Sequence, residues 1–353
     1  MKEKKKMNLA ATWEKVGMPF VLLVLVVFML IKAPNFGTVS NLFNVARSIS
    51  ISAILAAGMT FVIITTGIDL SVGSTIAVSG CIAVLAAQQG LNLHGHTFII
   101  IPLVLAAQQG LNPLLAILLG MVIGALIGLI NGFLIAYCNL AAFIVTLGTM
   151  TFMRGLAYTI TGGLPIVDNG LNFRALGNGY LFHVPIPFIV MIIVYVVMWI
   201  VLDKTKYGSH VYAVGGNAEA ARLAGINVKG VLLSVYVIAG LCAGLAGCIF
   251  AARVVSAQPT AGDGYEMDAI AAAVLGGTSL MGGKGKIPGT LIGAIIFGVL
   301  TTGLVLMNVP FFTQQLVKGI VIIIAVLIDG LKENSFSFGF LKGIGATQAK
   351  AAN

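Results

Sequence analysis

The segment IPFIVMIIVYVVMWIVL (Ile186–Leu202) carries no charged residue and shows no strict alternation of polar and apolar positions. An apolar run of this kind, like the other runs of about 20 residues along the chain, is long enough to cross the hydrocarbon core of a bilayer as a helix. Strands of a membrane barrel would alternate instead. Because backbone in lipid must satisfy its own hydrogen bonds, the segment predicts a transmembrane helix.

The composition extends this prediction to the whole chain. Hydrophobic residues make up 59% and charged residues 9%, against roughly 25% charged residues in an ordinary soluble domain. From Leu70 to Met153 there is no Asp, Glu, Lys or Arg. Such a chain cannot cover itself with polar surface, so an all-α, polytopic membrane bundle is predicted.

Hydropathy predicts about ten transmembrane helices. They lie near 16–32, 48–66, 72–88, 113–137, 142–160, 184–202, 230–252, 265–281, 287–307 and 312–330. The expected organisation is a cytoplasmic tail over 1–15, a single membrane domain over 16–330, and a second cytoplasmic tail over 331–353. The first span lacks a small-residue cleavage site, so it is interpreted as an anchor and not as a signal peptide.

The net charge of +9 is explained by orientation in the membrane, and no nucleic-acid partner is predicted. Basic residues cluster in short segments beside apolar runs, which is typical of cytoplasmic loops. With ten spans, both termini and the loop at 203–229 fall on the cytoplasmic side, together with Lys284 and Lys286. With eleven spans, these basic segments would not all lie on the same side of the membrane as the N-terminus.

The nonamer VLAAQQGLN occurs twice, at 84–92 and 104–112. The apolar run between the copies is too short for a span. The region 85–112 is therefore predicted to be a duplicated external loop that does not cross. Two histidines in it, His94 and His96, are weak evidence for a metal because no other ligand accompanies them. No metal site is predicted.

The run GMVIGALIGLINGFL places four glycines on one helical face. Small residues at this spacing let helix backbones approach closely. A packing seam is predicted along Gly120, Gly124, Gly128 and Gly132.

Three polar islands interrupt the apolar segments, and polar groups at depth face protein or water. In TTGIDLSVGST, Asp69 could cap the helix starting at Ser71 or bind a cation, and capping is preferred. In FIVTLGTMTFMRGLAYTITGG, hydroxyls such as Thr146 and Thr149 have two open interpretations. They line a path for a polyhydroxylated neutral solute, or they bond back to their own helix.

A third island, YEMDAIAAAVLGGTSLMGGKGKIPGTLIGA, is a helix broken by glycines, which is typical of transporter helices that line a cavity. Its short helix is predicted to end at Gly276 and Gly277, to turn at Gly282 and Gly283, and to restart after Pro288. Asp268 and Thr278 in this island join Thr146 and Thr149 as candidate residues of the solute path. The island fails as a phosphate-binding loop, because Gly285 follows Lys284 and Thr278 takes the place of the first glycine. No ATP site, cofactor or catalytic residue is predicted in this chain.

The stretch VYAVGGNAEAARLAGINVKG (Val211–Gly230) is polar and lies on the predicted cytoplasmic loop. Asn217 is a suitable N-cap, Ala218–Ala224 favours helix, and Gly225 is a natural stop. Glu219 and Arg222 form an i,i+3 pair. A helix this short is not stable alone in water, so it must dock on the membrane domain or on a partner.

Five motifs resemble the permease subunits of bacterial ABC sugar importers of the ribose, galactose and xylose class, with the ribose permeases nearest. They are GIDLSVGS, GLINGFLIAY, FIVTLGTM, YAVGGNAEAARLAGINV and YEMDAIAAAVLGGTSLMGG, in order along about 40–330. The duplicated 85–112 segment departs from the pattern. The resemblance implies the fold of the vitamin B12 importer permease and a multi-pass protein of the bacterial inner membrane.

The resemblance also implies partners: a cytoplasmic ATPase that hydrolyses ATP, a periplasmic sugar-binding protein, a second permease copy in a homodimer or heterodimer, and membrane lipid. It implies import of a ribose-like pentose or a hexose. It assigns the coupling helix that docks on the ATPase to Gly215, Gly216, Asn217, Glu219, Ala221, Arg222, Leu223 and Gly225. Related permeases for nucleosides, autoinducer sugars or branched-chain amino acids remain alternatives. A secondary transporter is disfavoured by the scarcity of ionisable residues at depth.

Overall fold

The computed structural model describes residues 9–88 and 112–332 of the chain. The chain divides into two units, Met1–Val309 and Pro310–Asn353. The predicted loop at 85–112 lies mostly outside the described residues, as do residues 1–8 and 333–353 of the predicted tails. Within the described part there are helices and four two-residue strands. The prediction of a helical protein is confirmed.

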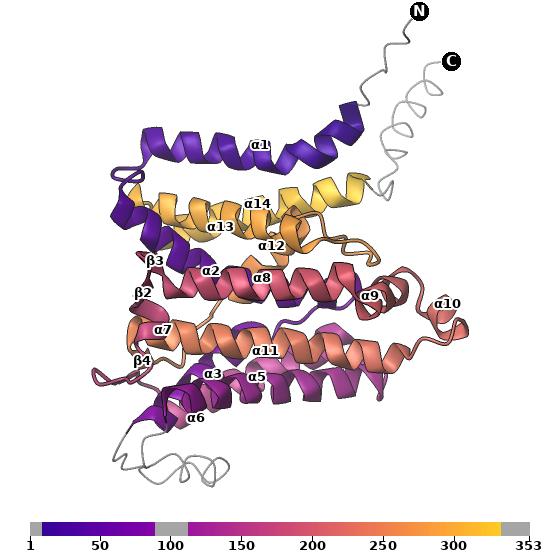
Figure 1. The fold of residues 1–353 in the computed structure, drawn as a ribbon, viewed down its shortest axis with the longest axis horizontal. Coiled ribbons are helices and arrows are strands. Elements are labelled where there is room, and N and C mark those ends of the chain that lie inside the picture. The colour runs from indigo at the N-terminus through magenta and orange to yellow at the C-terminus, as the bar shows by residue number, and fades with distance from the viewer. Residues whose placement is uncertain (1–8, 89–111, 333–353) are drawn as a thin grey trace, which may run out of the picture. The chain divides into compact units, whose positions relative to one another are not determined.

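The first unit holds all but one of the described helices (Figure 1). Their bounds are α1 Leu9–Lys32, α2 Val39–Ile64, α3 Val72–Ala87, α5 Pro113–Ala136, α6 Ala142–Thr161, α7 Ala175–Asn178, α8 Ile186–Lys204, α9 Lys206–Gly216, α10 Ala218–Leu223, α11 Val228–Val254, α12 Tyr265–Leu275 and α13 Ile287–Leu306. The second unit contains α14 (Phe311–Lys332), whose apolar side chains are mostly exposed.

Six of the described helices are long and apolar enough to cross a membrane. They are α2, α5, α6, α8, α11 and α13. Shorter apolar helices cover Gly17–Lys32, Val72–Ala87 and Phe311–Leu327. Together these elements confirm a polytopic helical membrane protein.

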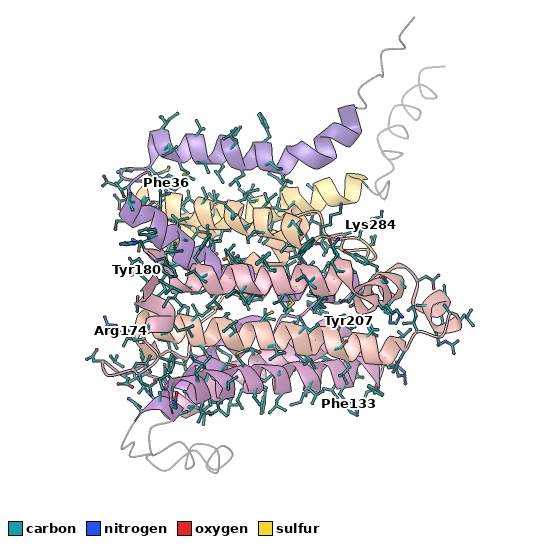
Figure 2. The ribbon with its side chains drawn as sticks, in the orientation of Figure 1. Phe36, Phe133, Arg174, Tyr180, Tyr207 and Lys284 are labelled. Carbon is teal, nitrogen blue, oxygen red and sulfur yellow. The ribbon has the colours of Figure 1, made fainter. Side chains whose placement is uncertain are left out.

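The core of the first unit forms around α2, α3 and α11. Every residue of α3 is buried, and α11 packs on α5, α3 and α2. The most apolar window of α2 is 83% buried, whereas that of α8 is only 22% buried. Helices α5 and α8 therefore form an outer layer. Phe133 of α5, for example, lies on its outer side (Figure 2) and is 51% exposed. An apolar outer layer of this kind suits contact with lipid.

The predicted glycine seam is confirmed, and its partner is α11. A Cβ at Gly128 would collide with the carbonyl oxygen of Tyr236, and one at Gly132 would lie 2.8 Å from that of Leu233. The contact between Gly124 and Gly240 is reciprocal, because a Cβ on either glycine would collide with the carbonyl oxygen of the other. Backbones can approach this closely only where side chains are absent.

Helices α1 and α2 begin earlier than predicted. Helix α1 starts at Leu9 and not at 16, so it extends into the segment predicted to be a tail. Helix α2 begins at Val39, well before residue 48, because Thr38 caps it: its Oγ1 accepts the Asn41 N–H at 3.3 Å. Helix α12 ends at Leu275, which confirms the predicted end of the short helix at Gly276 and Gly277 inside the hydropathic span 265–281, and Gly277 takes a φ of +88°. Its 11 residues are about 16 Å long, roughly half of the hydrocarbon core.

Short strands and turns gather at one end of this unit, opposite α9 and α10 (Figure 1). Strand β1 (Ile166–Val167) pairs antiparallel with β4 (Ser256–Ala257). Strands β2 (Tyr180–Leu181) and β3 (Val184–Pro185) form a hairpin. The unit thus has a strand end and an α10 end, with the long helices running between them.

Candidate functional site

The loop between α8 and α11 is built from two short helices at the α10 end. Thr205 caps α9 by accepting the Gly208 N–H at 3.3 Å. Asn227 caps α11 by accepting the Gly230 N–H at 3.0 Å. Sequence reasoning placed α10 in this loop but did not predict α9, which carries α10 on its C-terminal end.

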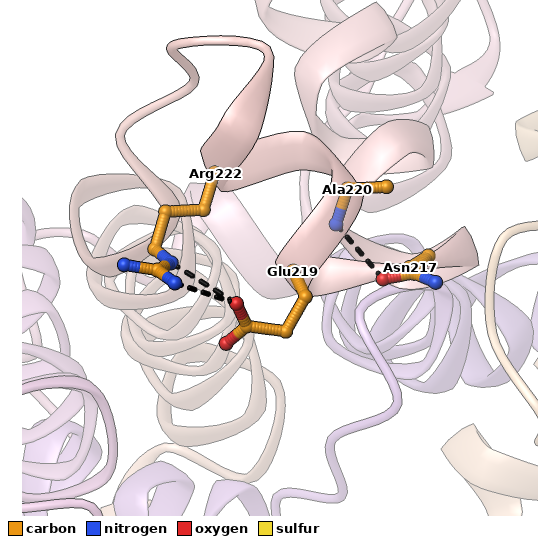
Figure 3. A network of polar contacts seen from close by, with 4 residues as sticks. All are labelled: Asn217, Glu219, Ala220 and Arg222. Carbon is orange, nitrogen blue, oxygen red and sulfur yellow. Dashed lines mark hydrogen bonds and ion pairs between the residues drawn. The ribbon is translucent and has the colours of Figure 1, made fainter.

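The local structure predicted for α10 is confirmed (Figure 3). The Asn217 Oδ1 accepts the Ala220 N–H at 2.9 Å, which satisfies one of the free donors of the first turn. Arg222 donates to Glu219 Oε2 from Nη2 at 2.8 Å and from Nε at 3.1 Å. Gly225 takes a φ of +82° after the helix ends.

Helix α10 has one buried position and an exposed face. Ala221 is 4% exposed, whereas Leu223 is 83% exposed. The side chains of Glu219 and Arg222 are 75% and 68% exposed. An exposed leucine next to a charged pair is typical of a surface that binds a protein partner, where apolar groups are surrounded by polar ones.

Helix α9 is fixed to its unit by two tyrosines. The Tyr212 hydroxyl donates to the Gly285 carbonyl oxygen at 2.8 Å, and Tyr207 shares a hydrogen bond of 2.7 Å with Ser234 of α11. Tyr207 and Lys284, which neighbours Gly285, both lie toward the α10 end (Figure 2). Burial, followed by the negative charge of Asp203, raises the pKa of Tyr212 to about 12. The hydroxyl therefore remains a donor at neutral pH.

Thr149, one of the two predicted path residues on α6, takes part in a largely buried chain of hydrogen bonds. The Thr149 hydroxyl donates to Asn131 Oδ1 at 2.6 Å. The Asn131 amide donates to Ser71 Oγ at 2.9 Å, and the Ser71 hydroxyl donates to Asp69 Oδ1 at 2.6 Å. Asn131, Ser71 and Asp69 are all buried. The chain thus links α6, α5 and the start of α3.

Thr146 bonds back to its own helix, which was the second of the two interpretations. Its hydroxyl donates to the Ala142 carbonyl oxygen at 2.9 Å. It also lies 3.3 Å from the Ile68 carbonyl oxygen in the break before α3. The capping role of Asp69 is confirmed in a modified form. Asp69 Oδ1 accepts the Ser71 N–H at 2.9 Å, although Ser71 itself is the N-cap of α3.

The other two path candidates lie on and after α12. Asp268 is buried on the first turn of this helix. Thr278 is fully buried, and its hydroxyl has no hydrogen-bond partner among the described residues. Helix α12 packs mainly on α2 and α13, whereas α6 packs on α3 and α5. The four candidates therefore form two separate pairs.

Sequence reasoning missed two polar contributors. Asn131 is the only polar side chain among the aliphatic, glycine and aromatic residues of α5, and that isolation was a signal. Arg154 of α6 donates from Nη1 to the carbonyl oxygens of Pro259 and Ala261, both at 2.8 Å. This contact fixes the segment that leads into α12, and nothing local in the sequence indicates it.

Potential metal ligands are sparse in this structure. In the described ranges, no group of three or more His, Cys, Asp or Glu side chains is placed to hold a metal ion. His94 and His96 lie outside those ranges.

Comparison with known proteins identifies relatives over nearly the whole chain. Residues 41–326 match the family described as branched-chain amino acid transport system / permease component. The chain is 45% identical to the ribose import permease protein of Bacillus subtilis (strain 168) over 94% of its length and 97% of the relative. It is 37% identical to the galactose/methyl galactoside import permease protein of Haemophilus influenzae, over 89% and 93% of the two chains. The D-allose transport system permease protein of Escherichia coli (strain K12) is 36% identical over 93% and 95%. No solved structure matches the chain.

Proposed function

Because this chain belongs to the sugar import permeases within the family of branched-chain amino acid transport system permease components, we propose that it forms the membrane path for a ribose-like monosaccharide. The observation that carries this function is 45% identity to a ribose import permease over almost the full length of both chains. Permeases named for galactose and allose are less similar, at 37% and 36% identity. Ribose is therefore the first substrate to test.

Uptake of labelled sugar tests this function directly. The permease is reconstituted in proteoliposomes with its own ATPase and binding protein, and ribose, galactose and allose are compared. Ribose uptake that requires ATP supports the proposal. Preferential uptake of a nucleoside or a branched-chain amino acid would identify a different permease of the family. Uptake driven by a proton or sodium gradient without ATP would identify a secondary transporter.

Ten membrane-crossing elements are proposed for each permease. Nine are apolar helices of sufficient or nearly sufficient length, six long and three shorter. The tenth is α12 with the Gly-rich segment after it, which together return the chain to the α10 end. With this count, both termini and the α10 end face the cytoplasm of a bacterial inner membrane, since the basic loops share one side. The resemblance supports two permease copies per importer.

The solute path is proposed to run past α6 and α12. Asp268 is buried on α12, and the Thr278 hydroxyl that follows it has no hydrogen-bond partner within the described ranges. A hydroxyl can both donate and accept, as the hydroxyls of a sugar require. Uptake by a Thr278→Val variant, with assembly and ATPase activity measured in parallel, tests this assignment. Unchanged uptake would place the path elsewhere.

Helix α10 is proposed to be the contact with the ATPase. The support is its capped, six-residue helix, its exposed Leu223, and its position in the loop that the resemblance assigns to coupling. Pro at Ala221 removes the 2.9 Å bond from its N–H to the Asn217 carbonyl oxygen, at a cost of about 3 kcal/mol or more. So short a helix cannot withstand that loss.

Ala218→Pro is the matched control. Ala218 is the first helical residue, where proline is tolerated, and Asn217 before it is already extended at φ −162° and ψ 105°, as proline requires. The Ala221→Pro permease should fail to recover the ATPase in a pull-down, or should transport no sugar while hydrolysis continues. The Ala218→Pro permease should behave as the unmodified protein. Normal recovery and uptake with Ala221→Pro would falsify the coupling role.

A further inference from the structure

Three backbone segments from distant parts of the sequence meet beside α10. The first is the end of α2 at Ile64. Carbonyl groups in the last turn of a helix have no partner within the helix. Here the Ile64 carbonyl oxygen accepts the Gly283 N–H at 2.9 Å, from the turn that follows α12.

The second and third segments are the end of α9 and the turn at Gly282 and Gly283. A Cβ at Gly215 would collide with the Ile64 carbonyl oxygen and would lie 2.8 Å from the Gly283 nitrogen. A Cβ at Gly282 would lie 2.7 Å from the Gly215 carbonyl oxygen. We call Ile64, Gly215, Gly282 and Gly283 the glycine junction. It is a contact of backbone on backbone.

A second contact reinforces the junction one helical turn earlier on α9. The Tyr212 hydroxyl donates to the Gly285 carbonyl oxygen at 2.8 Å. A Cβ at Gly285 would lie 2.9 Å from side-chain atoms of both Ile64 and Thr278. Helix α9 is thus held at two points against the segment between α12 and α13.

Each segment at the junction continues into a functional part of the permease. Ile64 precedes the break that carries Asp69 and leads to α3. Gly283 lies in the break between α12 and α13. Gly215 lies two residues before the N-cap of α10. Backbone atoms have no rotamers to absorb a displacement, and close-packed interiors transmit strain.

We infer that the glycine junction transmits movement of α10 to the two broken helix pairs, α2–α3 and α12–α13, and that Gly215 is its positioning residue. This inference rests on the proposed coupling role of α10. It adds the route inside the membrane unit, which a partner contact alone does not specify.

The test compares two helical glycines. Gly215→Ala places a methyl group in the junction, whereas a Cβ at Gly319 of α14 meets nothing within 4 Å. Each variant is purified with its ATPase and binding protein and reconstituted in proteoliposomes. ATPase recovery, stimulation of hydrolysis by sugar-loaded binding protein, and sugar transported per ATP are measured. Both variants should recover the ATPase. Gly215→Ala should lower sugar per ATP about tenfold, and Gly319→Ala should leave it unchanged.

A second pair decides the question if Gly215→Ala does not insert. Tyr212→Phe removes the bond to Gly285, and Tyr207→Phe removes the bond to Ser234, which is not part of the junction. Tyr212→Phe should lower sugar per ATP several-fold relative to Tyr207→Phe. Equal coupling ratios within both pairs would overturn the inference. If Ala221→Pro also transports normally, the coupling role of α10 itself fails, so the two failures are distinguishable.

Discussion

Replacing Thr149 by Val tests whether the buried hydrogen-bond chain holds α6 against α5. Valine has nearly the shape of threonine but cannot donate to Asn131 Oδ1, which lies 2.6 Å from the Thr149 hydroxyl. Removing one partner of a buried bond costs about 1–3 kcal/mol in soluble proteins. Interhelical bonds in a membrane protein average about 0.6 and reach about 1.7 kcal/mol. Because Asn131 is fully buried, we expect a loss near the upper membrane value, about 1.5 kcal/mol.

Thr151→Val is the matched control, two residues along the same helix. Its hydroxyl donates only to the Leu147 carbonyl oxygen of α6, at 3.1 Å, and the side chain is exposed. The free energy of unfolding is measured by titrating the purified permease in mild detergent with SDS. The control should change it by less than about 0.5 kcal/mol. Equal losses for the two variants would refute the idea that this bond stabilises the helix pair.

Three further predictions follow from the seam and from the orientation. Gly128→Ala should lower the free energy of unfolding by about 1–3 kcal/mol, as overpacking does. Gly148→Ala should not, because a Cβ there meets nothing within 4 Å. Equal SDS midpoints for the two variants would contradict this. A cysteine at His94 should react with an impermeant reagent from outside and one at Lys206 should not; external labelling at Lys206 would rule out ten spans. Deleting residues 85–104 should leave a folded, transporting permease, and loss of expression would show that the duplication is structural.

Helices long enough to span were predictable from the sequence because each carries a continuous apolar signal. The bounds of α5 at Pro113–Ala136 agree with the predicted 113–137 almost to the residue. Helix α10 was predictable for a different reason: its cap, ion pair and terminal glycine are all local. The end of α12 was predictable in the same way, because Gly276 and Gly277 mark it locally.

Contacts between distant segments lay beyond sequence reasoning. The glycines at 282 and 283 indicated a turn but not that the turn meets the end of α2. Tyr212 and Gly285 are 73 residues apart, and no periodicity connects them. Two-residue strands such as β1 and β4 also have no pattern of their own. For the site, the sequence predicted which polar residues are present at depth and on the loop. It did not predict which of them contact one another.

The reciprocal contact between Gly124 and Gly240 has a genetic consequence. A Cβ at either position would collide with the backbone carbonyl oxygen of the other glycine, and not with a side chain. A larger residue at either position therefore cannot be accommodated by trimming its neighbour, which is already the smallest residue. Second-site suppressors of a Gly124 variant should map to the outer layer, where whole helices can shift, and should not map to Gly240. Both positions should therefore remain glycine in most related permeases, and a substitution at one should not be accompanied by a compensating substitution at the other.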